Sequence, residues 1–151
     1  MNSLPRRTFL RQSLATAAAT FAVTGRGLAA PSETLRAAVI GLGGRGMKLA
    51  GEAADIPGLT ITWLVDPDEA RARGAKKIAP DAKVSQDLRE ALDDKEVDGV
   101  IISTCNHWHC LAAIWACQAG KDVYVEKPLG HNIAEQRRLI EISEAEGRIV
   151  Q

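Results

Sequence analysis

The sequence has no excess of charge of either sign, because 19 lysines and arginines face 19 aspartates and glutamates. The balance is uneven along the chain: residues 1–30 contain four arginines and no acidic residue. The remaining residues carry 15 basic and 19 acidic side chains, a difference of −4. A chain without a basic stripe lacks the electrostatic footprint of a nucleic-acid-binding protein. We therefore expect no nucleic-acid partner.

The sequence also lacks a long apolar run near its N-terminus. The mildly apolar residues 13–24 are too few to span a bilayer, which takes roughly 20 apolar residues. They follow a charged start and precede the small residues 27–30. This layout is typical of a signal peptide.

The charged start, residues 6–11, reads Arg-Arg-Thr-Phe-Leu-Arg and resembles the twin-arginine export motif. Pro5 stands where that motif usually has serine or threonine. The resemblance predicts a twin-arginine signal peptide at residues 1–30, the twin-arginine export machinery as a partner, and a periplasmic or otherwise exported protein. An uncleaved membrane anchor or a general secretory signal is the alternative.

Cysteine is scarce and poorly spaced for metal binding or for a disulfide. Cys110 and Cys117 lie about two helical turns, roughly 10 Å, apart, which is beyond disulfide reach. Cys105, Cys110 and the nearby His107 and His109 are ligand types, but they lack the paired spacing of a zinc site. We expect ordinary buried thiols and no metal.

Residues 31–151 contain no internal repeat and no low-complexity linker, and strand and helix patterns alternate along them. Apolar runs predict strands at 35–40, 59–65, 97–103 and 122–125, with another beginning at 149–150, and a short strand is expected at 83–85 after the turn at Pro80-Asp81. Helical patterns follow the glycines to residue 54 and recur at 67–78, 87–92, 111–119 and 134–145. Such alternation predicts an α/β fold with a doubly wound parallel sheet of the Rossmann type. Because the chain stops inside a strand pattern, we expect this domain to be incomplete at its C-terminus.

A glycine-rich segment, Gly41-Leu42-Gly43-Gly44-Arg45-Gly46, follows the first predicted strand and opens a helix. In this G-x-G-x-x-G pattern the first glycine permits a tight turn, the second lets the backbone approach a pyrophosphate, and the third allows close packing of helix on strand. The helix N-terminus offers N–H groups and partial positive charge to phosphates. The pattern predicts a dinucleotide site, and a plain strand–helix connection is the alternative.

Asp66 ends the second predicted strand, 20 residues after the last glycine of that segment. A carboxylate there accepts hydrogen bonds from the adenosine ribose and repels a 2′-phosphate, so we expect NAD rather than NADP. Arg45, Arg71 or Arg73 would weaken that preference. Asp66 is also a candidate N-cap for a helix beginning at Pro67, and the two roles are compatible.

Two polar segments follow later strands: residues 103–109, and Glu126-Lys127-Pro128. Ligands of open α/β sheets bind at the carboxyl ends of the strands. The first segment predicts a wall on the nicotinamide side or, alternatively, a solvated turn with Asn106 as N-cap. Lys127 is placed to contact a substrate hydroxyl or carbonyl and to move a proton during hydride transfer. A surface ion pair with Glu126 is the alternative.

Taken together, these segments resemble the Gfo/Idh/MocA family of glucose–fructose oxidoreductases and inositol dehydrogenases. The resemblance covers residues 35–151, and residues 113–128 look very like the secreted, sugar-related branch. It implies a two-domain enzyme that uses NAD or NADP on a sugar, inositol or related polyol and forms a homo-oligomer when full length. The second α+β sheet domain of the family is then missing from this chain.

The resemblance also implies roles for single residues. Lys127 is the expected catalytic lysine, of a kind often followed by a cis-proline, and Asn106 and Glu126 are expected to flank the nicotinamide ribose. The expected cofactor-binding residues are Gly41, Gly43, Gly44, Arg45, Gly46, Asp66, Thr104, Asn106, His109, Glu126 and Lys127. Cys105 stands where the family usually has proline, which would leave this loop freer to move.

Three functions are open at this stage. The first is an exported NAD(P)-dependent oxidoreductase acting on CH–OH groups, of which this portion alone is expected to be inactive. The second is an NAD-assisted glycoside hydrolase, in which transient oxidation of the sugar labilises its glycosidic bond. The third is a truncated dinucleotide-binding module without catalysis. The segment Glu126-Lys127-Pro128 favours the first, because the glycosidases associated with this family vary that lysine.

Overall fold

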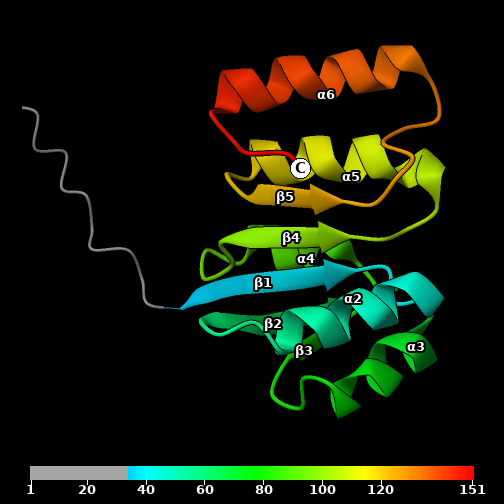
Figure 1. The fold of residues 1–151 in the computed structure, drawn as a ribbon, viewed down its shortest axis with the longest axis vertical. Coiled ribbons are helices and arrows are strands. Elements are labelled where there is room, and N and C mark those ends of the chain that lie inside the picture. Colours follow the sequence, from blue (N-terminus) through cyan, green and yellow to red (C-terminus); the bar gives the residue numbers. More distant parts are fainter. Residues whose placement is uncertain (1–33) are drawn as a thin grey trace, which may run out of the picture. The chain divides into compact units, whose positions relative to one another are not determined.

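The computed structural model describes residues 34–151, so the predicted signal peptide lies outside the described residues. The described residues form one sheet of five parallel strands in the order β3-β2-β1-β4-β5 (Figure 1). The strands are β1 (Leu35–Ile40), β2 (Leu59–Val65), β3 (Lys83–Ser85), β4 (Gly99–Ile102) and β5 (Asp122–Val125). The helices are α2 (Gly44–Ala54), α3 (Glu69–Gly74), the short 3-10 helix η1 (Ala75–Lys77), α4 (Leu88–Asp93), α5 (Asn106–Gln118) and α6 (Ile133–Glu146). The predicted doubly wound parallel sheet is confirmed.

Two apolar cores cover the two faces of the sheet, and β1 contributes to both. Val39 belongs to the core beneath α2 and α3, whereas Ala38 and Ile40 belong to the core beneath α4 and α5. Side chains alternate along a strand, so a strand covered on both faces must be apolar throughout. This explains why residues 37–40 of β1 are all apolar and buried. None of the described helices is long and apolar enough to cross a membrane.

Two helices, α3 and α5, start two or more residues away from the predicted position. The helix expected from Pro67 begins at Glu69, and its N-cap is Asp68, whose carboxylate accepts the backbone N–H groups of residues 70 and 71. The candidate N-cap role of Asp66 is therefore wrong. The helix expected from 111 begins at Asn106, so Asn106 lies in its first turn and Cys105 occupies the N-cap position without a side-chain cap bond.

The end of the chain pairs with β5, as the last predicted strand required. Val150 forms a parallel bridge with Val123, whose N–H donates to the carbonyl of Ile149 at 2.8 Å. The N–H of Gln151 donates in turn to the carbonyl of Val123 at 2.9 Å. The fourth strand is shorter than predicted, because residues 94–98 form a polar loop in front of it.

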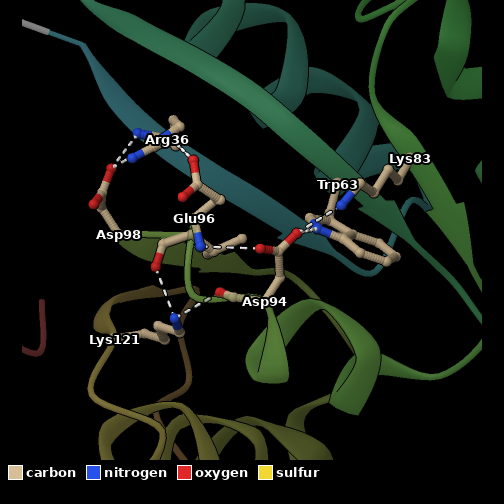
Figure 2. A network of polar contacts seen from close by, with 8 residues as sticks. Arg36, Trp63, Lys83, Asp94, Glu96, Asp98 and Lys121 are labelled. Carbon is tan, nitrogen blue, oxygen red and sulfur yellow. Dashed lines mark hydrogen bonds and ion pairs between the residues drawn. The ribbon is translucent and has the colours of Figure 1, made fainter.

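This loop carries a network of polar contacts at the amino-terminal edge of the sheet (Figure 2). The carboxylate of Asp94 accepts the indole N–H of Trp63 and the ammonium of Lys83, both at 2.8 Å. Lys121 is 5% exposed, and its ammonium donates to the carbonyls of Asp94 and Val97, each at 2.8 Å. The hydrogen bonds from Lys83 and then Trp63 hold the pKa of Asp94 well below its ordinary value. The network fixes the loop that leads into β4.

Candidate functional site

The candidate site lies at the carboxyl-terminal edge of the sheet, opposite the polar network. Since every strand is parallel to its neighbours, the segments after β1, β2, β4 and β5 all emerge at this edge (Figure 1). The chain runs from β1 outward to β3 and then returns to β4 on the other side of β1. This reversal is a topological switch point, where open α/β sheets bind their ligands.

The glycine turn between β1 and α2 has space only where a diphosphate would need it. Gly41 has φ +88°, and a Cβ there would lie 2.7 Å from the carbonyl of Ser103; a Cβ on Gly46 would lie 1.8 Å from the carbonyl oxygen of Gly41. In contrast, a Cβ on Gly43 or Gly44 meets no atom within 4 Å. Gly43 is the N-cap of α2 and provides no side-chain cap, so the first N–H groups of the helix keep their capacity for an anion. The turn therefore fits a dinucleotide.

Asp66 joins this turn to the start of α3. It is 5% exposed; one carboxylate oxygen accepts the N–H of Leu42 at 2.7 Å and the other accepts the N–H of Asp68 at 2.9 Å. A carboxylate has about four lone-pair sites, so these two bonds leave acceptor capacity for ribose hydroxyls. The structure places Asp66 beside the glycine turn, as its predicted role requires.

Arg45 and Glu126 form an ion pair across the site. Glu126 follows β5 and is 7% exposed; one of its oxygens accepts the Nε–H of Arg45 at 2.7 Å and lies 2.5 Å from Nη2 in an ion pair. The hydrogen bond from Arg45 lowers the pKa of Glu126, and the same bond raises the pKa of Arg45. The sequence offered Lys127 as the ionic partner of Glu126, but Lys127 contributes only its backbone N–H, at 3.2 Å.

An open cavity of about 850 Å³ brings five of the predicted site residues together: Arg45, Thr104, His109, Glu126 and Lys127. The side chain of Lys127 is exposed, and its peptide bond to Pro128 is cis, as the family resemblance implied. Asn106 is exposed in the first turn of α5 and does not line this cavity. Its predicted contact with the nicotinamide ribose stays a prediction.

His109 joins the two loops that carry the polar segments. The ring is 3% exposed; Nδ1 lies 2.7 Å from the carbonyl oxygen of Pro128 and Nε2 lies 2.9 Å from that of Thr104. Both ring nitrogens thus contact the backbone. The sequence indicated His109 as part of the cavity wall but gave no sign of this bridging position.

The cysteines are free, and two of the three match the expectation of buried thiols. Cys110 and Cys117 are buried, and burial raises the pKa of both thiols. Cys105 is exposed. Within residues 34–151 no group of three or more His, Cys, Asp or Glu side chains is placed to hold a metal ion.

Residues 35–151 match the oxidoreductase family with an NAD-binding Rossmann fold, Gfo/Idh/MocA. The chain belongs to this family. The match confirms the predicted dinucleotide fold and NAD as its cofactor, whereas the preference for NAD over NADP stays a prediction.

The known proteins that this chain resembles are much longer than the chain itself. An inositol 2-dehydrogenase of Salmonella typhimurium is 36% identical over 117 residues, which cover 76% of this chain and 35% of the relative. A protein of Shewanella sp. (strain ANA-3) called glycosyl hydrolase family 109 protein 2 is 33% identical, and the match covers 95% of this chain and 38% of that protein. The crystal structure of GenD2 from gentamicin A biosynthesis, in complex with NAD, is 31% identical with a TM-score of 0.74, covering 78% of this chain and 33% of GenD2. The chain thus spans about a third of the length of the proteins it matches.

Proposed function

We propose that this chain is the cofactor-binding portion of an exported oxidoreductase that moves a hydride between NAD and a hydroxyl-bearing carbon of a sugar, inositol or related polyol. The position of Lys127 carries the proposal. Lys127 lines the same cavity as Arg45, which belongs to the dinucleotide-binding turn, and Glu126. A substrate that enters this cavity meets an amine next to the cofactor site.

The chemistry divides between the cofactor and the chain. When bound, NAD supplies the acceptor for the hydride that leaves the substrate carbon. The hydroxyl proton must leave as the C–O bond becomes a carbonyl, and the amine of Lys127 in its neutral form accepts it. The bonds from His109 to the carbonyl of Pro128 and from the N–H of Lys127 to Glu126 hold the backbone on both sides of this amine.

The identity with the Salmonella inositol 2-dehydrogenase supports a polyol as the substrate class. Export is supported by the arginine pair and apolar run of residues 1–30, which resemble a twin-arginine signal. We further propose that the whole protein acts as a homo-oligomer and retains its cofactor tightly, because an exported enzyme meets little free NAD.

The test is an assay of the protein as its host makes it, with a panel of inositols, aldoses and their alcohols, following the formation of NADH. We expect NADH with at least one polyol, and a Lys127→Met variant that forms NADH at least about 100-fold more slowly even when NAD is saturating, the scale of general acid–base catalysis. An unchanged rate in the variant would remove Lys127 from the reaction. No formation of NADH with any of the polyols would reject the proposal.

A second candidate is NAD-assisted glycoside hydrolysis. It is favoured by the Shewanella relative, whose match extends over 95% of this chain, further than the 76% of the Salmonella dehydrogenase. In this reaction the hydride returns to the sugar, so the glycosidic product is released without net NADH. Measuring both products with an aryl glycoside separates the two candidates.

A further inference from the structure

The ion pair between Arg45 and Glu126 connects two walls of the site. Arg45 is the second residue of α2, at the end of the glycine turn, whereas Glu126 follows β5, 81 residues later in the sequence. A carboxylate that is almost fully buried needs a charged or hydrogen-bonding partner to offset its lost hydration. Arg45 provides that partner, so the two walls are held in a fixed relation through this contact.

The guanidinium keeps donors for a second ligand. Of its five N–H groups, the one on Nε donates a hydrogen bond to Glu126, and Nη2 lies 2.5 Å from the same oxygen. The side chain is 48% exposed and lines the open cavity. Next to it in sequence are Gly43 and Gly44, whose missing side chains leave open space at the helix N-terminus.

We propose that Arg45 binds the diphosphate of the dinucleotide while it remains held by Glu126, so that Glu126 is a positioning residue for the phosphates and the ion pair links the two halves of the cofactor site. The proposal rests on the dinucleotide-binding role of this chain. By holding Arg45, Glu126 would favour binding of the diphosphate, even though its own negative carboxylate repels the phosphates.

Because of that repulsion, the direction in which a Glu126→Gln replacement changes phosphate binding distinguishes the possible roles of Glu126. If Glu126 acts only through its charge, replacing it with glutamine removes a negative charge near an anion and tightens phosphate binding. If Glu126 positions Arg45, the same replacement releases the guanidinium and weakens phosphate binding. A purely structural role would weaken all ligands of the site to the same degree.

The experiment titrates the complete chain with ADP-ribose, which has both phosphates, and with AMP, which has one. We expect Arg45→Ala to weaken ADP-ribose binding by about 10- to 100-fold, the scale of a lost charge-assisted hydrogen bond, and AMP by much less. Glu126→Gln should weaken ADP-ribose by about threefold or more, and this effect should vanish in the Arg45→Ala background, as coupled residues require. Arg45→Lys keeps the charge without the forked geometry and should show intermediate binding.

Arg138 and Glu141 offer a matched control, because they form an exposed pair of the same residue types on α6, with Nη1 2.9 Å from Oε2. Arg138→Ala and Glu141→Gln should leave ADP-ribose binding unchanged. Thermal unfolding of each variant identifies any that fail to fold, and Arg45→Lys then replaces Arg45→Ala in the cycle. Tighter or unchanged ADP-ribose binding in a folded Glu126→Gln variant would overturn the inference, and so would additive effects in the double variant. Neither result would contradict the dinucleotide-binding role of the chain. A folded wild-type chain that binds neither NAD nor ADP-ribose would overturn the inference and the dinucleotide role together.

Discussion

The imidazole of His109 lies 2.7 Å from the carbonyl oxygen of Pro128, which fastens the first turns of α5 to the turn that carries Lys127. The other ring nitrogen contacts the carbonyl of Thr104, after β4. One buried ring therefore sets the relation between the two loops that form the cavity.

We expect His109→Ala to lower the free energy of unfolding by about 1–3 kcal/mol, because the buried ring is lost and two partly buried backbone carbonyls lose their partner. It should also reduce the turnover of the whole enzyme by displacing Lys127. Urea unfolding and the rate of NADH formation measure the two effects. His107→Ala, an exposed neighbour on the same turn, is the control and should change neither. Equal stability of the two variants would show that the bridge contributes nothing.

Gly43→Ala should separate binding from stability. The backbone at Gly43 has φ −67°, which alanine adopts freely, and an added Cβ meets no protein atom within 4 Å. We therefore expect thermal stability to stay within about 0.5 kcal/mol and NAD binding to weaken by roughly tenfold or more, since the methyl group occupies the approach to the helix N-terminus.

The control for that variant is Gly51→Ala on the same helix, where an added Cβ also meets nothing within 4 Å. It should raise stability by about 0.5–1 kcal/mol, because alanine is the better helix former, and leave NAD binding unchanged. If Gly43→Ala binds NAD as well as Gly51→Ala does, the diphosphate does not approach at Gly43.

Asp66→Asn should weaken NAD binding more than NADP binding, because the amide removes the charge that would repel a 2′-phosphate. Dissociation constants for both nucleotides, measured on the same variant, give the ratio directly. Asp81→Asn, an exposed change in the turn before β3, should leave the ratio as it is in the wild type. Equal losses for the two nucleotides would remove Asp66 from the ribose site.

Asp94 is expected to make the stability of the fold depend on pH in the acid range, through its contacts at the amino-terminal edge of the sheet. Its pKa is lowered by hydrogen bonds from Lys83 and Trp63, so its contribution to stability is fully present above the unfolded value, about 3.9. That contribution is lost as the pH falls from there through the lower folded-state pKa. Asp94→Asn should cost about 1–3 kcal/mol at neutral pH, and the difference from wild type should shrink below about pH 4.

Unfolding by urea at several pH values, followed by tryptophan fluorescence, tests this prediction. Asp93→Asn is the matched control, because Asp93 is the exposed neighbour of Asp94 at the end of α4. A constant difference between wild type and Asp94→Asn across the acid range would contradict the assigned role.

The sequence predicts the sheet well because its strands are encoded locally. The bounds of β1, β2, β3 and β5 coincide with the prediction, since β1, β2 and β5 are mainly apolar segments bounded by polar or turn residues and β3 follows the turn at Pro80-Asp81. The start of α5 is different. Its first turn, Asn-His-Trp-His, has no apolar periodicity, and Cys105 is not a capping residue type.

The N-cap of α3 shows how tertiary contacts decide between equal local signals. Asp66 and Asp68 are both good capping residues beside the same proline. One carboxylate oxygen of Asp66 accepts the N–H of Leu42 from the glycine turn, whereas the carboxylate of Asp68 accepts the N–H groups of residues 70 and 71, and the helix begins after Asp68. The pair of Arg45 and Glu126 lay equally beyond prediction, because nothing in the sequence relates two residues 81 positions apart.

The polar network around Asp94 and Lys121 lies at the end of the sheet away from the cofactor turn. For protein engineering, this division means that the loops after β1, β2, β4 and β5 can be varied without changing the polar contacts that hold the opposite edge of the sheet. Libraries that vary those loops to alter nucleotide or substrate preference should therefore retain a high fraction of folded members, provided that Gly41, Gly46, His109 and the residues of the opposite edge are kept constant.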